Sequence, residues 1–159
     1  MNIINEAGIL AISTRLQRLS EQIRKDGALI YKEFGIDFEP KWFPVILTLY
    51  HQKSLNVVEL ANEIGYSHPS TISLLKELEK KKLIISRKNK LDERKRQIML
   101  TKEGLQLIEK MKPVWELISK ALYDIFEKEN GLLSAIDKAE ERLSHQSFLQ
   151  RALQLKSEK

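Results

Sequence analysis

Small polar residues lie where the sequence predicts the start of a helix, in the stretch SHPSTISLLK that runs from Ser67 to Lys76. Ser67 is a candidate N-cap, and Pro69 fits near a helix start because the first N–H groups of a helix have no intrahelical partners. A helix that enters the major groove of DNA contacts bases with residues near its N-terminus, where small side chains permit close approach. The chemistry that this stretch predicts is hydrogen bonding to base edges and phosphates.

Helical spacing divides this segment into an inner and an outer face. Ile72, Leu75 and Leu78 form the expected inner face, at steps of three. The side chains left outside are candidates for base or phosphate contact, together with His68 at the same end: Ser70, Thr71, Ser73 and Lys76. The alternative is that the hydroxyls only cap the helix and that His68 is an ordinary surface residue. For Ser67 we favour capping, although it stays among the DNA-binding candidates.

Basic charge is concentrated directly after this segment. Residues 76–96 hold ten basic and four acidic side chains, a net charge of +6, whereas the rest of the chain has 17 basic and 18 acidic side chains, a net charge of −1. A solvated helix face carries a more even mix of signs, so a local surplus favours a polyanionic partner. Four residues of this stretch are further DNA-binding candidates: Arg87, Lys88, Arg94 and Arg96.

Two short helices and a hairpin are expected to position these side chains. Asn56 followed by Glu59 predicts a capped helix start, and Gly65 predicts a tight reversal at its end. The helix described above follows that reversal. Residues 83–88 and 96–100 carry branched apolar side chains on either side of a polar, turn-prone segment, which predicts a β-hairpin. A helix-turn-helix followed by a basic hairpin is a winged helix.

Long amphipathic helices are expected at both ends of the chain. Apolar residues recur at steps of three and four from residue 5 to residue 33, again after residue 104 with Pro113 as an interruption, and once more in a helix from residue 132 to residue 153. A further short helix is expected over residues 42–50, with Pro44 in its first turn. Narrow apolar stripes are typical of helices that pack lengthwise on other helices.

Neither terminal stripe can be buried alone, so we expect a shared helical layer that a second subunit completes. The predicted fold is mainly α with a small β-hairpin wing: a winged helix-turn-helix with a helical dimerisation layer formed by the N- and C-terminal helices. We assign residues 1–36 and 104–159 to the dimerisation region. Residues 37–103 are the expected winged helix-turn-helix DNA-binding region.

Several classes of protein find no support in the 159 residues. With no cysteine there is no disulfide or thiolate metal site, the three histidines are scattered, and no glycine-rich loop is placed to cradle a phosphate, so we expect no enzyme, no metal and no cofactor. The apolar runs are too short to span a bilayer, and the N-terminus lacks the features of a secretion signal. We expect a soluble, cytoplasmic protein.

Two motifs resemble those of the MarR family of winged-helix transcriptional regulators. LANEIGYSHPSTISLLKELEKKKLI resembles the family's helix-turn-helix. DERKRQIMLTKEG carries a signature similar to the family's wing, Asp-x-Arg and then Leu-Thr-x-x-Gly, at Asp92, Arg94, Leu100, Thr101 and Gly104. The resemblance implies that Asp92 orients Arg94, that Arg94 reaches toward the minor groove, and that Thr101 caps the following helix. Lys82 departs from the family, which often has glycine at that position.

The resemblance extends to the N-terminal segments LAISTRLQRLSEQI and DFEPKWFPVI, which look like the regulator half of proteins in which such a segment precedes an acetyltransferase domain. Because the chain ends at Lys159, we expect no acetyltransferase. The resemblance also implies a small-molecule effector between the helical layer and the winged-helix lobe. Four aromatic residues are candidates for its pocket, although core packing is the commoner role of such side chains: Phe38, Trp42, Phe43 and Trp115.

These patterns predict a homodimer that binds double-stranded DNA sequence-specifically and regulates transcription. Its operator is expected to be a palindrome with half-site centres about 10 bp apart, or a multiple of that. The alternative is a winged-helix module that binds protein, or nucleic acid without sequence preference. Such a module would tolerate Arg94→Ala and Thr71→Ala without losing affinity for a duplex, whereas a DNA reader would not.

Overall fold

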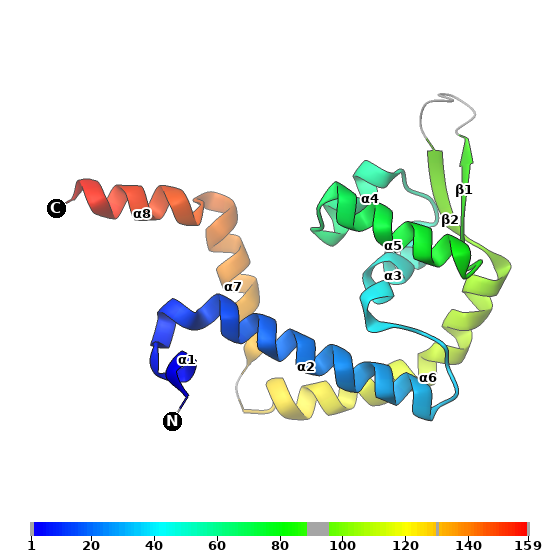
Figure 1. Ribbon diagram of the computed structural model, residues 1–159, viewed down its shortest axis with the longest axis horizontal. Coiled ribbons are helices and arrows are strands. Elements are labelled where there is room, and N and C mark those ends of the chain that lie inside the picture. The colour runs from blue at the N-terminus through cyan, green and yellow to red at the C-terminus, as the bar shows by residue number, and fades with distance from the viewer. Residues whose placement is uncertain (1, 89–95, 130, 159) are drawn as a thin grey trace. The chain divides into compact units, whose positions relative to one another are not determined.

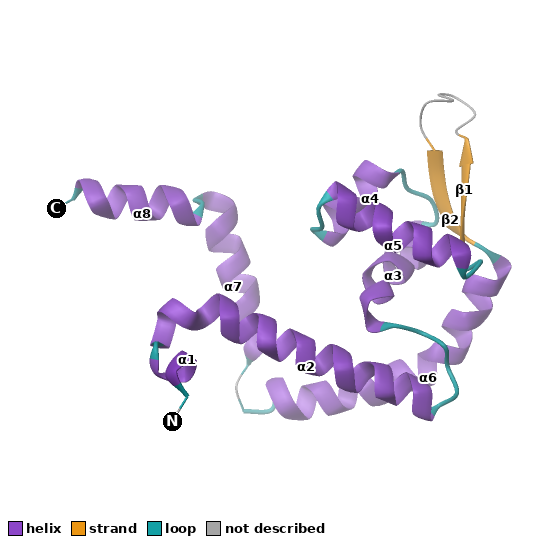
Figure 2. Cartoon of the chain, viewed as in Figure 1, coloured by secondary structure: helices purple, strands orange, loops and turns teal. Residues whose placement is uncertain are grey.

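The computed structural model of the protein describes residues 2–88, 96–129 and 131–158. The chain divides into two compact units, Met1–Val114 and Trp115–Lys159. Figure 1 shows the order of the elements, and Figure 2 separates helices, strands and loops. The described residues are mainly helical with a two-stranded antiparallel hairpin, which confirms the predicted fold class.

The N-terminal segment is interrupted near its start. Helix α1 (Ile3–Glu6) and the short 3-10 helix η1 (Gly8–Ala11) precede the long helix α2 (Ile12–Glu33). Gly8 has a φ of 61°, a left-handed conformation that an α-helix does not continue through. The prediction of one helix from residue 5 is therefore wrong for its first turns and confirmed from residue 12 onward.

The chain turns into the core of the first unit after α2. The 3-10 helix η2 (Pro40–Trp42) leads into helix α3 (Phe43–Gln52). Pro44 lies in the first turn of α3, as predicted, where its missing N–H removes no helical hydrogen bond. Three side chains of α3 are fully buried: Val45, Ile46 and Leu49.

Helices α4 (Val57–Ile64) and α5 (His68–Lys80) form the helix-turn-helix. The Asn56 side chain accepts hydrogen bonds from two backbone N–H groups of α4 at 2.9 and 3.0 Å, and the Glu59 carboxylate accepts one from the Asn56 N–H at 2.8 Å. This reciprocal capping box confirms the predicted helix start. Gly65 ends α4 in the left-handed conformation, with a φ of 69°, which confirms the predicted turn.

The buried face of α5 differs from the predicted one. Its buried residues are Thr71, Leu74, Leu75 and Leu78, whereas Ile72 is half-buried. These four positions follow the i, i+3, i+4, i+7 spacing of one helix face. The prediction that Thr71 faces outward is wrong, because this spacing turns its side chain into the core.

Strands β1 (Ile84–Lys88) and β2 (Arg96–Leu100) form the expected hairpin, with Ile84 opposite Leu100 and Lys88 opposite Arg96. The backbone of Leu55 exchanges two hydrogen bonds with that of Ile98, at 3.2 and 2.8 Å. The segment before α4 is thereby joined to β2. Since Ile98 is only 2% exposed, the base of the hairpin is part of the core and fixes the wing to the helix-turn-helix.

Helix α6 (Lys102–Phe126) begins in the first unit and ends in the second. The helix continues through Pro113, so the predicted interruption removes a hydrogen bond without ending the helix. Its N-terminal half contributes four buried residues to the first unit: Gly104, Ile108, Met111 and Val114. The helix thus supplies one wall of the core beneath the hairpin.

The C-terminal segment forms two helices, α7 (Leu132–His145) and α8 (Phe148–Ser157). Gln146 between them is extended, with a φ of −152°. The Ser147 hydroxyl accepts from the Gln150 N–H at 3.2 Å, and the Gln150 side chain accepts from the Ser147 N–H at 2.9 Å. The prediction of one helix through residue 153 is wrong because this capping box starts a new helix.

Candidate nucleic-acid interface

The N-terminal half of α5 presents small polar side chains to solvent. Ser70, Ser73 and Lys76 are exposed, at steps of three along one side of the helix. His68 is exposed at the same end. The structure therefore brings four of the predicted DNA-binding residues together on an open surface at the start of a helix, where backbone N–H groups also face outward.

Ser67 is the N-cap of α5, as the sequence favours. Its hydroxyl oxygen accepts a hydrogen bond from the Ser70 N–H at 3.3 Å, and its O–H donates to the Ser70 hydroxyl oxygen at 2.8 Å. Among the described residues, the Ser70 hydroxyl accepts one hydrogen bond and donates none, so its proton can be donated to an acceptor outside the protein. Of these two hydroxyls, Ser70 is the better suited to contact a base or a phosphate.

Thr71 has a structural role at the same helix start. Its side chain is fully buried, and its hydroxyl donates to the Ser67 carbonyl oxygen at 3.0 Å. A side chain without exposed surface cannot meet a groove, so the predicted contact between Thr71 and DNA is corrected. The residue instead packs the first turn of α5 onto the core and satisfies its own hydroxyl there.

The hairpin carries exposed basic side chains on both strands, namely Arg87, Lys88 and Arg96. The Arg96 guanidinium donates from Nε to the Ser86 hydroxyl at 2.7 Å and from Nη2 to the Ser86 carbonyl at 3.0 Å. These bonds hold the Arg96 charge against β1. Asp92 and Arg94 lie outside the described residues, so the roles that the resemblance implies for them stay predictions.

A close backbone contact joins the hairpin to α6. The Thr101 hydroxyl accepts from the Gly104 N–H at 3.0 Å and donates to the Lys82 carbonyl at 2.7 Å. This confirms the expected capping role of Thr101. A Cβ built on Gly104 would lie 2.2 Å from the Leu83 carbonyl oxygen, so no larger residue fits unless the backbone moves. Thr101 and Gly104, two residues of the Leu-Thr-x-x-Gly signature, therefore have structural roles.

Lys82 occupies a position that favours glycine. Its φ is 60°, in the left-handed region. The Lys82 N–H donates to the Glu79 carbonyl at 2.9 Å and the Leu83 N–H donates to the Leu78 carbonyl at 3.0 Å, the pattern that ends a helix in a Schellman motif. The turn geometry is thus kept with lysine in place of glycine, at the cost of backbone strain.

Glu77 makes a contact that sequence reasoning missed. The indole N–H of Trp42 donates to Glu77 Oε2 at 2.8 Å, and the Lys41 ammonium lies 2.7 Å from the same oxygen. The Lys41 ammonium and the Trp42 N–H lower the pKa of Glu77, and hydrogen bonding to Glu77 raises the pKa of Lys41. A buried tryptophan needs an acceptor for its N–H, but this acceptor is 35 residues away in the sequence.

Two of the aromatic effector candidates belong to the core. Phe38 and Trp42 are buried and pack edge to face with ring centroids 5.7 Å apart, and Tyr31 packs on Phe38 at 5.0 Å. Such pairs stabilise cores beyond the area they bury. Phe43 is exposed at the start of α3, and Trp115 is half-exposed in the second unit. A shared effector pocket for these four residues stays a prediction.

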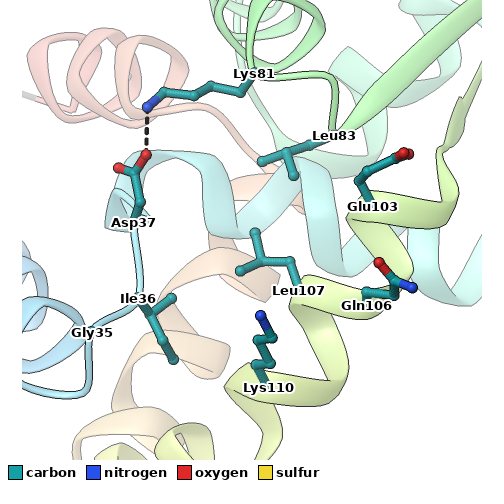
Figure 3. Close-up of a pocket in the computed structure, with 9 residues that line it drawn as sticks. All are labelled: Gly35, Ile36, Asp37, Lys81, Leu83, Glu103, Gln106, Leu107 and Lys110. Carbon is teal, nitrogen blue, oxygen red and sulfur yellow. Dashed lines mark hydrogen bonds and ion pairs between the residues drawn. The ribbon is translucent and has the colours of Figure 1, made fainter.

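A surface pocket of about 360 Å³ lies beside the C-terminal end of α5 (Figure 3). The Lys81 ammonium and the Asp37 carboxylate form an ion pair at 2.6 Å on one side of it. None of the four aromatic candidates lines this pocket. Its lining combines the loop after α2, the end of α5 and the start of α6: Gly35, Ile36, Asp37, Lys81, Leu83, Glu103, Gln106, Leu107 and Lys110.

The described ranges offer neither a membrane-spanning helix nor a cluster of metal ligands. Within them, no helix is both long enough and apolar enough to cross a membrane. The same residues contain no group of three or more histidine, aspartate or glutamate side chains placed to hold a metal ion.

A helix-turn-helix whose second helix is followed by an antiparallel hairpin defines a winged-helix protein. Residues 35–95 match the model of the MarR family, so this segment of the chain is similar to the members of that family. The matched range holds α4, α5 and β1, and it ends at the last residue before β2.

Individual proteins are also similar to this chain. The chain is 31% identical over 85 residues to the HTH-type transcriptional regulator SarZ of Staphylococcus haemolyticus, a match that covers 54% of this chain and 55%, about half, of that protein. The repressor CouR bound to a 23-mer DNA duplex superposes with a TM-score of 0.69 and 24% identity, over 83% of this chain and 95% of CouR. The MepR–DNA complex of S. aureus gives a TM-score of 0.68 and 22% identity, over 83% of this chain and 96% of MepR. At such identities the likeness to the solved structures establishes the fold.

Proposed function

We propose that the protein is a transcriptional regulator that binds double-stranded DNA sequence-specifically, with α5 in the major groove. The observation that carries this proposal is the open N-terminal half of α5, where Ser70 and Ser73 are exposed beside a capped helix start. Small hydroxyl side chains at this place allow the helix to approach base edges closely. The names of the relatives support the proposal, since SarZ is called a transcriptional regulator and CouR and MepR were solved with DNA.

The hairpin supplies the electrostatic part of the interface. Arg87, Lys88 and Arg96 are exposed on its two strands, toward the end of the hairpin that lies away from Ile84 and Leu100. Cations on a wing beside a recognition helix contact phosphates and release counterions, which gives affinity without sequence preference. In the proposed division of work, the wing supplies affinity and α5 supplies sequence discrimination.

The protein acts as a homodimer in this proposal, with residues 1–36 and 104–159 as its dimerisation region. Large apolar side chains at both ends are exposed in the single chain, for example Leu10 at 90% and Phe148 at 80%. A second copy of the chain would cover these exposed apolar side chains at both ends. Two recognition helices related by two-fold symmetry would then read a palindrome with half-site centres about 10 bp apart, or a multiple of that.

The pocket beside α5 is the proposed effector site. Its volume of about 360 Å³ is within the range of small-molecule pockets, roughly 300–1,000 Å³. Its lining includes Lys81, directly after α5, and Lys110 of α6. A ligand that contacts both would bind one arrangement of these helices better than another, which is the requirement for control of DNA affinity. Leu107→Trp, which fills the pocket, is expected to abolish any effect of such a ligand on DNA binding.

Salt dependence distinguishes this function from a protein-binding module. Fluorescence anisotropy with labelled DNA and RNA duplexes of equal length would be measured over a range of NaCl concentrations. For DNA we expect the logarithm of affinity to fall linearly with the logarithm of salt concentration, with a slope of about −0.9 for each phosphate neutralised. Binding that is insensitive to salt, or equal for RNA and DNA, would contradict the proposal and favour a different partner.

A further inference from the structure

Three positions of α5 lie on one side of the helix but differ in their surroundings. Ser70, Ser73 and Glu77 follow the i, i+3, i+7 spacing that places side chains on one stripe. The two serines are exposed, whereas the carboxylate of Glu77 is held by η2, which donates from the Trp42 indole at 2.8 Å and from the Lys41 ammonium at 2.7 Å. The stripe proposed to read DNA is thus fixed at its C-terminal end by a contact within the protein.

The partners of Glu77 are well placed to fix a rotation. Trp42 is only 2% exposed, with its ring packed against Phe38, so the indole N–H has little freedom to follow the helix. Rotation of α5 by about 10° about its axis would move a side-chain atom about 5 Å from that axis by about 0.9 Å. A displacement of that size breaks a hydrogen bond, whose length varies by only about 0.5 Å.

Two further contacts fix the ends of the helix in the same way. Arg24 Nη2 of α2 donates to the Tyr66 hydroxyl at 3.2 Å, in the turn before α5. The Lys81 ammonium just after α5 pairs with the Asp37 carboxylate at 2.6 Å. The segment from α2 to η2 therefore holds α5 at its start, at Glu77 and at its end, and of these three contacts Glu77 lies on the serine stripe.

We infer that Glu77 is a positioning residue of the DNA interface: through Trp42 and Lys41 it sets the rotation of α5 and hence the direction of Ser70 and Ser73. The inference rests on the proposed function, because it assigns these serines to base recognition. Glu77 itself contacts no base. Its loss is expected to reduce discrimination between sequences while leaving the affinity contributed by phosphate contacts unchanged.

The matched pair Glu77→Gln and Glu79→Gln tests this role. Each substitution removes one negative charge from α5, so both change the attraction of the helix for DNA to a similar extent. Glutamine at position 77 still offers Trp42 an acceptor but loses the charge-assisted bond to Lys41. Glu79 is exposed and forms no ion pair among the described residues, so its replacement leaves the position of the helix unchanged.

The measured quantity is the ratio of the dissociation constants for a scrambled duplex and for a duplex that the wild-type protein enriches from a random library. In Glu77→Gln this ratio is expected to fall by roughly three- to tenfold, the size of a typical coupling between neighbouring residues. In Glu79→Gln it should change less than about twofold, and the salt slope should be that of the wild type in both variants. Equal ratios in the two variants would overturn the inference.

Lys41→Met removes the same ion pair from the η2 side. Because this variant leaves the sequence of α5 unchanged, it separates loss of the ion pair from any effect of the Glu77→Gln substitution on the folding of the helix. Combined with Glu77→Gln, it is expected to lower the ratio no further than either change alone, because both act through one contact. Additive losses would count against the inference. The urea midpoints of all variants, compared with the wild type, identify any that fail to fold.

Failure of the proposed function is distinguishable from failure of this inference. If the wild-type protein does not discriminate between duplexes at all, the proposed function fails. The positioning role is then decided by amide hydrogen exchange of residues 70–76. Faster exchange in Glu77→Gln than in Glu79→Gln supports it, and equal exchange contradicts it.

Discussion

A Cβ placed on Gly104 would lie 2.2 Å from the carbonyl oxygen of Leu83. That oxygen also accepts a hydrogen bond from the Thr101 N–H at 3.0 Å, so it cannot move away without breaking the bond. The contact holds the first turn of α6 against the entry to the hairpin. Helix α6, the wing and the end of α5 therefore meet at one point.

Gly104→Ala is expected to destabilise the protein. Overpacking against a fixed backbone oxygen costs about 1–3 kcal/mol, more than the gain of about 1 kcal/mol that alanine brings to a helix. Gly27→Ala in α2 is the matched control, since its Cβ would meet the Pro40 ring at 3.2 Å and a side chain can shift. Urea unfolding of the two variants measures the difference. A Gly104→Ala protein as stable as the control would refute the close contact.

Lys82→Gly is expected to stabilise the protein, because glycine adopts the left-handed φ of 60° without strain. The gain should be up to about 1 kcal/mol, the lower end of the cost of left-handed backbone in an L-residue. Lys82→Ala removes the same charge and keeps the strain, so its stability should stay near that of the wild type. Thermal melting of the three proteins separates the two effects, and equal melting points for glycine and alanine would exclude strain.

Loss of the hydroxyl is expected to lower stability at Thr71 and to lower sequence preference for DNA at Ser73. Thr71→Val removes a buried hydrogen bond to the Ser67 carbonyl, so the free energy of unfolding should fall by about 1 kcal/mol. Ser73→Ala changes an exposed side chain, so stability should be unchanged while preference for the selected duplex falls. Urea unfolding and anisotropy of both variants make the comparison. Loss of stability in Ser73→Ala would place its side chain inside the fold.

The contribution of Glu77 to stability should depend on pH. Its folded-state pKa is lowered below the ordinary value of 4.5 by the Lys41 ammonium and the Trp42 N–H. A lowered carboxylate pKa stabilises the folded state above 4.5, and this contribution is lost as the pH falls through the lowered pKa. The difference in unfolding free energy between wild type and Glu77→Gln should therefore shrink below about pH 4.5. A difference constant from pH 3 to pH 6 would show that the ion pair contributes nothing.

Local signals in the sequence predicted much of the fold. The Asn56 capping box, the left-handed Gly65 and the Ser67 cap each depend on residues a few positions apart, and the structure contains all three. The missed break in the C-terminal helix also had a local signal, the Ser147 capping box with Gln150. These features can be found from sequence because a helix end is decided by its own first and last turns.

The rotation of α5 about its axis, and the contacts that hold the helix in place, could not be predicted from the sequence. Thr71 is buried although it is polar, because its hydroxyl finds an acceptor four residues back and the helix turns it inward. The contact between Glu77 and Trp42 joins residues 35 positions apart, which no helical or strand period connects. Sequence reasoning therefore placed Thr71 on the wrong face of α5, and it missed Glu77, the residue now proposed to orient the helix.

The most direct test of the account is selection of DNA from a randomised duplex library by the wild-type protein at moderate salt, followed by sequencing of the bound fraction. We expect enrichment of a palindrome with half-site centres about 10 bp apart, or a multiple of that, and weaker enrichment by Ser73→Ala. Salt-sensitive binding without any enriched sequence would contradict it, because the basic hairpin would then bind DNA without recognition by α5.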